Sequence, residues 1–275
     1  MSATVFRPPT GREIERLERT LVAAKVFVDV TEMRRALDAE PWRLRVNDRG
    51  DVAVLGRWRD HLPMLAIEAL WCPVAGIPAA VRSFLALGEE HGLTDVVSPP
   101  TPVEETAAYE SAGMHVQTVV TTYMMQRLTG IPAPEMPPGL AVRAAGPRDL
   151  STLLGLDAAC FEPFWRYDAR HLARFFSLGR LALAEQDGQA VGYTLCTVDG
   201  DDGLLGRLCV LPEWRRKGIG SALLVESLRY VSRHGGGRIT LSTQVDNVPS
   251  QALYRSAALR DTGRRYAFLR FGDEG

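Results

Sequence analysis

The sequence has few cysteines, almost no net charge and no long apolar run. Its 275 residues include four cysteines, and no two of them form a Cys-x-x-Cys pair. Scattered thiols are typical of reduced proteins and argue against a disulfide framework or a zinc site, so we expect no metal. The formal net charge of −1 argues against a protein that binds nucleic acid or a membrane surface, because such proteins concentrate positive charge.

Long apolar segments are also missing. No run approaches the roughly 18–20 consecutive apolar residues that a membrane-spanning helix needs. Residues 1–18 contain no apolar core of the kind found in signal peptides, so we expect a cytoplasmic protein. With 46% apolar and 24% charged residues, the chain has the composition of a globular protein, and its length allows two modest domains.

The most informative segment is residues 208–221, LCVLPEWRRKGIGS. Its apolar start predicts a buried strand that ends at Pro212, and a basic turn then leads into an apolar helix. Glycines at a helix start let an anion approach the backbone, where N–H groups and the helix dipole stabilise negative charge. The candidate anion-binding residues are Arg215, Arg216, Lys217, Gly218, Ile219, Gly220 and Ser221. The pattern predicts a site for a diphosphate-bearing ligand, although the glycines alternatively allow close helix packing and Arg216 fits a solvated surface.

The elements after this segment follow a recognisable order. We expect a helix from Ile219, a strand over residues 239–243, and a helix that begins near Asn247 and contains Tyr254. This order, the Arg-x-x-Gly-x-Gly spacing and the Asn-to-Leu-Tyr element resemble the GCN5-related N-acetyltransferase (GNAT) family over residues 140–271. The resemblance implies a mixed α/β sheet flanked by helices. It also implies acetyl-CoA as donor and direct attack of a primary amine in a ternary complex.

The resemblance also assigns roles to individual residues. The backbone of Leu208, Cys209 and Val210 is expected to pair with the pantetheine arm of coenzyme A. Asn247 is expected to shape the crossover near the cofactor, although a plain helix cap fits it equally well. Tyr254 is the candidate general acid that protonates the departing thiolate, with a core tyrosine as the alternative.

The general base is not evident from the sequence. Many family members carry a glutamate where this chain has Gly206, so the base is expected elsewhere, or is water. The candidates are Glu162, Asp168 and His171, each of which also fits an ordinary surface charge. Glu162, Phe164 and Trp165 are the candidate substrate residues, because this aromatic-rich segment lines an acceptor pocket or, alternatively, fills a domain seam.

The chain repeats its own pattern. Residues 108–114, around Tyr109, correspond to residues 253–259, around Tyr254, and the flanking segments match at nearly the same separation. A proline-rich stretch lies between the two copies. The sequence therefore predicts two tandem GNAT folds: a first domain over residues 1–130, a linker over residues 131–139 and a second domain over residues 140–275.

The two copies differ in their chemistry. At the place of the basic turn, the first copy has Gly76-Ile77-Pro78 without a lysine or arginine, and the proline removes a backbone donor. We therefore expect the first domain to be non-catalytic and the second to be active. Mycothiol synthases share this tandem layout, but no feature of the sequence singles out their substrate.

Two functions from different classes follow from these features. The first is an acetyl-CoA-dependent N-acetyltransferase acting on a small-molecule amine, or on the amino terminus or a lysine of a protein. The second is a catalytically idle acyl-CoA-binding or scaffold protein, which the missing strand glutamate favours. The sequence is compatible with a monomer or a homodimer.

Overall fold

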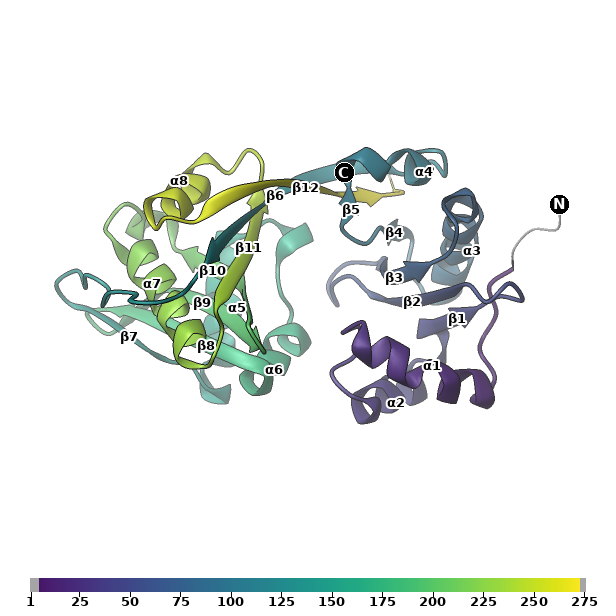
Figure 1. Ribbon diagram of the computed structural model, residues 1–275, viewed down its shortest axis with the longest axis horizontal. Coiled ribbons are helices and arrows are strands. Elements are labelled where there is room, and N and C mark those ends of the chain that lie inside the picture. Colours follow the sequence, from purple (N-terminus) through teal and green to yellow (C-terminus); the bar gives the residue numbers. More distant parts are fainter. Residues whose placement is uncertain (1–4, 273–275) are drawn as a thin grey trace. The chain divides into compact units, whose positions relative to one another are not determined.

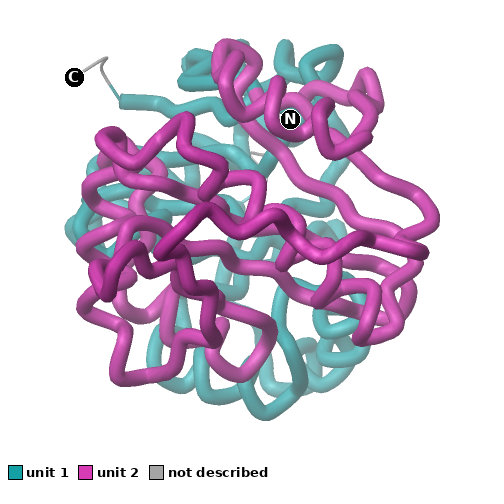
Figure 2. The backbone as a smooth tube through the Cα atoms, turned by 90° about the vertical axis from the view of Figure 1, so that its left-hand side faces the viewer, with its two compact units in different colours: residues 1–119, 266–275 teal, residues 120–265 magenta. Residues whose placement is uncertain are grey.

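The computed structural model describes residues 5–272, which form two compact units. Unit 1 comprises residues 1–119 and 266–275, and unit 2 comprises residues 120–265 (Figure 2). These units do not follow the predicted boundaries at residues 130 and 140. The reason is that two strands, β6 (His115–Gln126) and β12 (Arg260–Arg270), each begin in one unit and end in the other.

Unit 1 contains a mixed sheet with the strand order β1-β2-β3-β4. Only β3 and β4 pair in parallel, and Arg270 near the end of β12 pairs with Val97 on β4. The strands are β1 (Leu44–Val46), β2 (Val52–Arg57), β3 (Met64–Trp71), β4 (Asp95–Val97) and the short β5 (Thr101–Pro102). The helices are α1 (Gly11–Ala23), α2 (Val30–Ala39), α3 (Ile77–Glu90) and α4 (Ala107–Glu110).

Unit 2 contains a larger mixed sheet with the strand order β7-β8-β9-β10-β11-β6. Within it only β10 and β11 pair in parallel. Its further strands are β7 (Leu140–Ala144), β8 (Gly179–Gln186), β9 (Gln189–Asp199), β10 (Asp202–Val210) and β11 (Arg238–Gln244). Its helices are α5 (Leu150–Cys160), α6 (Ala169–Leu178), α7 (Ile219–Arg233) and α8 (Val248–Ser256).

Helices cover both faces of the unit 2 sheet (Figure 1). On one face Leu183 of β8 packs in a cluster with Leu153 of α5 and Leu172 of α6. On the other face Ala184 of β8 packs with Leu223 of α7. Successive strand residues point to opposite faces, so this alternation explains how one strand contributes to two cores. The result is the mixed α/β sheet flanked by helices that the sequence predicts.

The internal repeat is visible in how the first helix of each unit begins. Arg7 donates two hydrogen bonds to Glu13 in the first turn of α1, and Arg143 donates two to Asp149 just before α5. In each half of the chain a long helix, a strand, a shorter helix and a long strand follow in this order, with the short β5 added in the first half. Within residues 5–272, no helix is both long and apolar enough to span a membrane.

Candidate functional site

Two strands of the unit 2 sheet part beside the predicted anion-binding turn. β10 and β11 pair from Asp202 and Arg238 as far as Leu205 and Leu241. Beyond that point β10 continues to pair only with β9, and β11 with β6. A register shift at Gly206 marks the place of separation. The edge of β10 after Leu205 has therefore lost its strand partner, and its backbone groups on that side are placed to pair with a ligand.

The turn after β10 exposes its basic residues. A short 3-10 helix over Pro212–Trp214 follows the strand, and the Arg215 Nε donates to the Val210 carbonyl at 3.1 Å. The Lys217 ammonium lies 4.4 Å from the centre of the Trp214 ring. Both cations, and Arg216 between them, remain exposed to solvent. They are therefore available to pair with an anion.

Helix α7 begins without a side-chain cap. Gly218 is its N-cap residue in the left-handed conformation, with φ of +83°, and no side chain accepts from the first helical N–H groups. Those groups are left for another acceptor, as in an anion site. In unit 1 the equivalent helix α3 begins at Gly76 with φ of −85° and with Pro78 in its first turn. The two helix starts thus differ in conformation, because Gly218 is left-handed and Gly76 is not.

Helix α8 brings the other predicted donor-site residues close to this turn. A Cβ atom on Gly220 would lie 3.4 Å from the Leu253 side chain, so the start of α7 packs closely on α8. Asn247 is the N-cap of α8, and its side-chain oxygen accepts from the Ser250 N–H at 3.2 Å. Asn247 therefore forms the helix cap that the sequence allows, while a contact with the cofactor stays a prediction.

Tyr254 lies inside the unit 2 core. It is 6% exposed, packs with Leu205 and Leu241 at the point where β10 and β11 part, and its ring centre lies 5.7 Å from that of Tyr123. Burial raises the pKa of Tyr254 to about 12. Its hydroxyl therefore stays protonated near neutral pH and remains a proton donor, as the predicted acid must be.

The predicted acceptor segment joins α5 to α6. Glu162 is exposed, whereas Phe164 and Trp165 are half-buried and pack edge to face with ring centres 5.0 Å apart. At the start of α6, one Asp168 oxygen accepts from the His171 N–H at 2.9 Å, and the other lies 2.7 Å from His171 Nδ1. Two of the three candidate bases are thus joined in one histidine–carboxylate pair.

Sequence reasoning missed a buried charged cluster between β10 and α5. Asp157 is fully buried and Arg207 is 9% exposed, and the Arg207 Nε donates to Asp157 at 2.9 Å. The Tyr193 hydroxyl donates to the same carboxylate. Asp157 and Arg207 lie 50 positions apart in the sequence, so no local motif marks the cluster. Its one signal is an arginine within an otherwise apolar strand.

Two of the scattered cysteines also meet. Cys160 and Cys209 are neighbours: the Cys209 thiol lowers the pKa of Cys160, while burial raises the pKa of Cys209 well above its ordinary value. Arg215 adds to the lowering at Cys160. All four cysteines are free, and the part of the chain from residue 5 to 272 contains no group of three or more side chains arranged to hold a metal.

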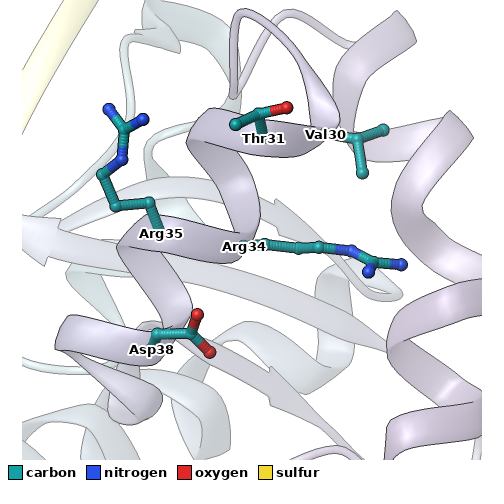
Figure 3. Close-up of a pocket in the computed structure, with 5 residues that line it drawn as sticks. All are labelled: Val30, Thr31, Arg34, Arg35 and Asp38. Atoms are coloured by element: carbon teal, nitrogen blue, oxygen red, sulfur yellow. The ribbon is translucent and has the colours of Figure 1, made fainter.

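A surface hollow of about 500 Å³ lies elsewhere, on helix α2 of unit 1. Its lining residues are Val30, Thr31, Arg34, Arg35 and Asp38 (Figure 3). The Arg34 and Arg35 side chains point in different directions, and Arg34 pairs with Glu18 at 2.6 Å. The hollow includes no predicted site residue and lacks the uncapped helix start described above.

The sequence of unit 2 is similar to known acetyltransferases. Residues 150–258 match the sequence profile of the acetyltransferase (GNAT) family. Mycothiol acetyltransferase from Clavibacter sepedonicus is 32% identical over 142 residues, which cover 48% of this chain and 47% of that protein. A putative [ribosomal protein bS18]-alanine N-acetyltransferase from Bacillus subtilis is 25% identical over 126 residues, covering 46% of this chain and 83% of that protein. The chain thus spans about half the length of the mycothiol acetyltransferase it matches.

The whole fold is similar to that of solved structures. A GCN5-related N-acetyltransferase from Sphaerobacter thermophilus matches with a TM-score of 0.65 at 21% identity, over 98% of this chain and 96% of that one. A tandem GNAT protein from the clavulanic acid biosynthesis pathway matches with a TM-score of 0.61 at 18% identity, over 82% and 80% of the two chains. These likenesses confirm the predicted tandem arrangement of two GNAT folds.

Proposed function

We propose that unit 2 transfers an acetyl group from acetyl-CoA to a primary amine, because residues 150–258 match the GNAT family profile and the fold is similar to that of a tandem GNAT protein. The observation that carries this proposal is the parting of β10 from β11 directly before the uncapped, left-handed start of α7. Acetyl-CoA, when bound, supplies the acetyl thioester. The described residues fit it, because an extended arm needs a strand edge and a diphosphate needs unpaired N–H groups.

The donor is bound mainly by backbone groups in this proposal. The free edge of β10 at residues 208–210 pairs with the pantetheine arm and presents an N–H group to the thioester oxygen, where negative charge develops. The N–H groups at the start of α7 bind the diphosphate, with added charge pairing from Arg215 and Lys217. Unpaired N–H groups that already point at the ligand need no reorganisation on binding.

Protons are moved by two groups in this proposal. An attacking amine has to lose a proton, and the pair of His171 and Asp168 has the arrangement of a general base. In this proposal the proton lies on His171 Nδ1, 2.7 Å from Asp168, and Nε2 is the nitrogen that takes the proton of the amine. The amine nitrogen bonds to the acetyl carbon, the carbon–sulfur bond breaks, and Tyr254 gives its hydroxyl proton to the departing thiolate.

Unit 1 has a supporting role in this proposal. The start of α3 lacks both the left-handed glycine and the cations of the unit 2 turn, so it does not offer the same anion site. Two names among the relatives indicate acceptor classes: mycothiol acetyltransferase, and alanine N-acetyltransferase for ribosomal protein bS18. A small-molecule amine and a protein amino terminus are therefore the first acceptors to test.

Calorimetric titration with acetyl-CoA, followed by mass spectrometry of products from a panel of amines, tests the proposal. The panel contains a peptide with an amino-terminal alanine, a lysine-containing peptide with a blocked amino terminus, and an S-protected cysteine amide. We expect one acetyl-CoA per chain and acetylation of at least one panel member. Absence of binding would overturn the proposal. Binding without transfer to any amine, across a widened panel, would favour the idle scaffold protein.

A further inference from the structure

The buried arginine of β10 packs against two aromatic rings. The Arg207 guanidinium carbon lies 4.0 Å from the centre of the Phe161 ring and 3.8 Å from that of Tyr167. The flat guanidinium is suited to this position because it can stack on two rings while its edge donates hydrogen bonds. Its edge here donates to Asp157 and to the Trp165 carbonyl. Arg207 thus contacts the segment between α5 and α6 at three residues.

The stack continues from Tyr167 to the proposed base. The His171 imidazole lies nearly parallel to the Tyr167 ring, at 9°, with centres 5.8 Å apart. Tyr167 therefore contacts both the Arg207 guanidinium and the His171 ring. The Tyr167 N–H also donates to the buried Asp157 carboxylate at 2.6 Å, which fixes the backbone beside the ring.

Arg207 belongs to the strand that carries the proposed donor site. Arg207 lies on β10 within the stretch that no longer pairs with β11, and its carbonyl accepts from the Thr194 hydroxyl at 2.9 Å. A change in the Arg207 side chain therefore disturbs the contact between this strand and the segment that contains His171. The same change leaves the turn at Gly218 without a direct alteration.

We propose that Arg207 is a positioning residue that holds the segment of residues 161–171, and with it His171, in register with strand β10. The effect of Arg207 on kcat rests on the proposed function, whereas its effect on the order of residues 161–171 does not. Arg207 acts through the Tyr167 ring on His171 and takes no proton itself. The buried pair with Asp157 fixes the direction of the guanidinium plane, because both carboxylate oxygens accept from it.

Two substitutions separate charge from stacking. Arg207→Lys keeps the positive charge beside Asp157 but loses the planar group that stacks on the rings. Tyr167→Leu keeps the buried ion pair but removes the ring that stacks with His171. Tyr167→Phe retains the ring and serves as the rescue variant. Arg180→Lys is the matched control, since Arg180 also pairs with a carboxylate, Glu226 at 3.1 Å, and lies over a ring, Tyr230, outside this segment.

The experiment combines hydrogen exchange of residues 161–171 with calorimetric binding of acetyl-CoA on the full chain. We expect amide exchange in this segment to rise about tenfold in Arg207→Lys and in Tyr167→Leu, through local opening. Exchange is expected to stay at the wild-type rate in Tyr167→Phe and Arg180→Lys, and the Kd for acetyl-CoA to stay within twofold in all four variants. Where a panel amine is acetylated, kcat is expected to fall about tenfold or more through misplacement of the base, with KM for acetyl-CoA unchanged.

Two results would overturn the proposal. The first is unchanged exchange in residues 161–171 of both Arg207→Lys and Tyr167→Leu. The second is a rise in exchange across all of unit 2 together with weaker acetyl-CoA binding, which indicates a general contribution to stability only. Failure to find an acceptor amine would count against the proposed function alone, because exchange and donor binding do not require turnover.

Discussion

The left-handed residue at the start of α7 allows a sharp test of the donor site. Gly218 has φ of +83°, and a Cβ atom there would lie 3.1 Å from Pro137 Cγ. Gly76, at the equivalent start of α3, has φ of −85°, and the nearest atom to its added Cβ is the Cys72 sulfur at 3.7 Å. Gly218→Ala and Gly76→Ala thus make the same chemical change in two different conformations.

The expected magnitude follows from the backbone. A residue with a Cβ atom costs about 1–2 kcal/mol in the left-handed region. In the ligand-free variant the turn relaxes out of the left-handed conformation to avoid this cost, and binding of acetyl-CoA has to restore that conformation. At 1.4 kcal/mol per tenfold change, the Kd for acetyl-CoA is therefore expected to rise about 5-fold to 30-fold. The contact with Pro137 adds to the cost. Gly76→Ala is expected to leave the Kd unchanged, because that conformation is open to alanine.

Calorimetric titration with acetyl-CoA measures both variants, and thermal unfolding shows whether each remains folded. A folded Gly218→Ala variant that binds acetyl-CoA as tightly as the wild type would refute the assignment of the α7 start as the diphosphate site. Weaker binding in Gly76→Ala alone would move the site to unit 1. Equally weakened acetyl-CoA binding in both variants would show that the starts of α7 and α3 do not differ in their contribution to the donor site.

Three further predictions concern the acid, the repeated ion pair and the cysteines. Tyr254→Phe is expected to lower kcat by about a hundredfold or more while the Kd for acetyl-CoA stays unchanged, measured by product formation and calorimetry. The ion pair with Arg143 lowers the pKa of Asp149 from its ordinary 3.8 to about 2. Its stabilisation is therefore present in full above the ordinary pKa and is lost as pH falls from there to about 2. Urea unfolding of Asp149→Asn should therefore show a smaller loss of stability in acid than the wild type. Iodoacetamide at about pH 8 is expected to alkylate Cys160 before Cys209, and Cys209→Ala to slow that reaction, as followed by mass spectrometry.

Each of these predictions has an outcome that contradicts it. Wild-type turnover in Tyr254→Phe would leave the tyrosine as a core residue only. Equal acid sensitivity of Asp149→Asn and the wild type would mean that the ion pair persists in the unfolded chain or contributes nothing. Faster alkylation of Cys209 than of Cys160 would contradict the burial of Cys209 and the opposite pKa shifts of the two thiols.

Local sequence was enough to predict where helix α7 begins. Residue order indicated a basic turn that leads through Gly218 into an apolar helix, and the structure adds that Gly218 is left-handed and that no side chain caps the helix. The helix cap at Asn247 and the inequality of the two copies at Pro78 were equally local. Each depends on residues within a few positions of one another, where spacing alone constrains geometry.

The boundaries of the compact units were not readable in the same way. The sequence predicts a break in the linker at residues 131–139, because proline-rich segments separate domains. The structure instead ends unit 1 at residue 119 and returns to it at residue 266. The strand pattern of β6 and β12 gives their extended conformation, but not the partner strand with which each residue pairs.

The sequence by itself determined the tandem repeat, the order of elements and the helix start at Gly218, because short-range spacing fixes turns, caps and periodic faces. The tertiary structure alone decided which distant side chains meet. It placed Arg207 against Phe161 and Tyr167, joined it to the buried Asp157, and brought Cys160 to Cys209. Such contacts arise from the packing of α5 and its following segment on β10. No local pattern records them, because each partner alone looks like an ordinary residue of its own element.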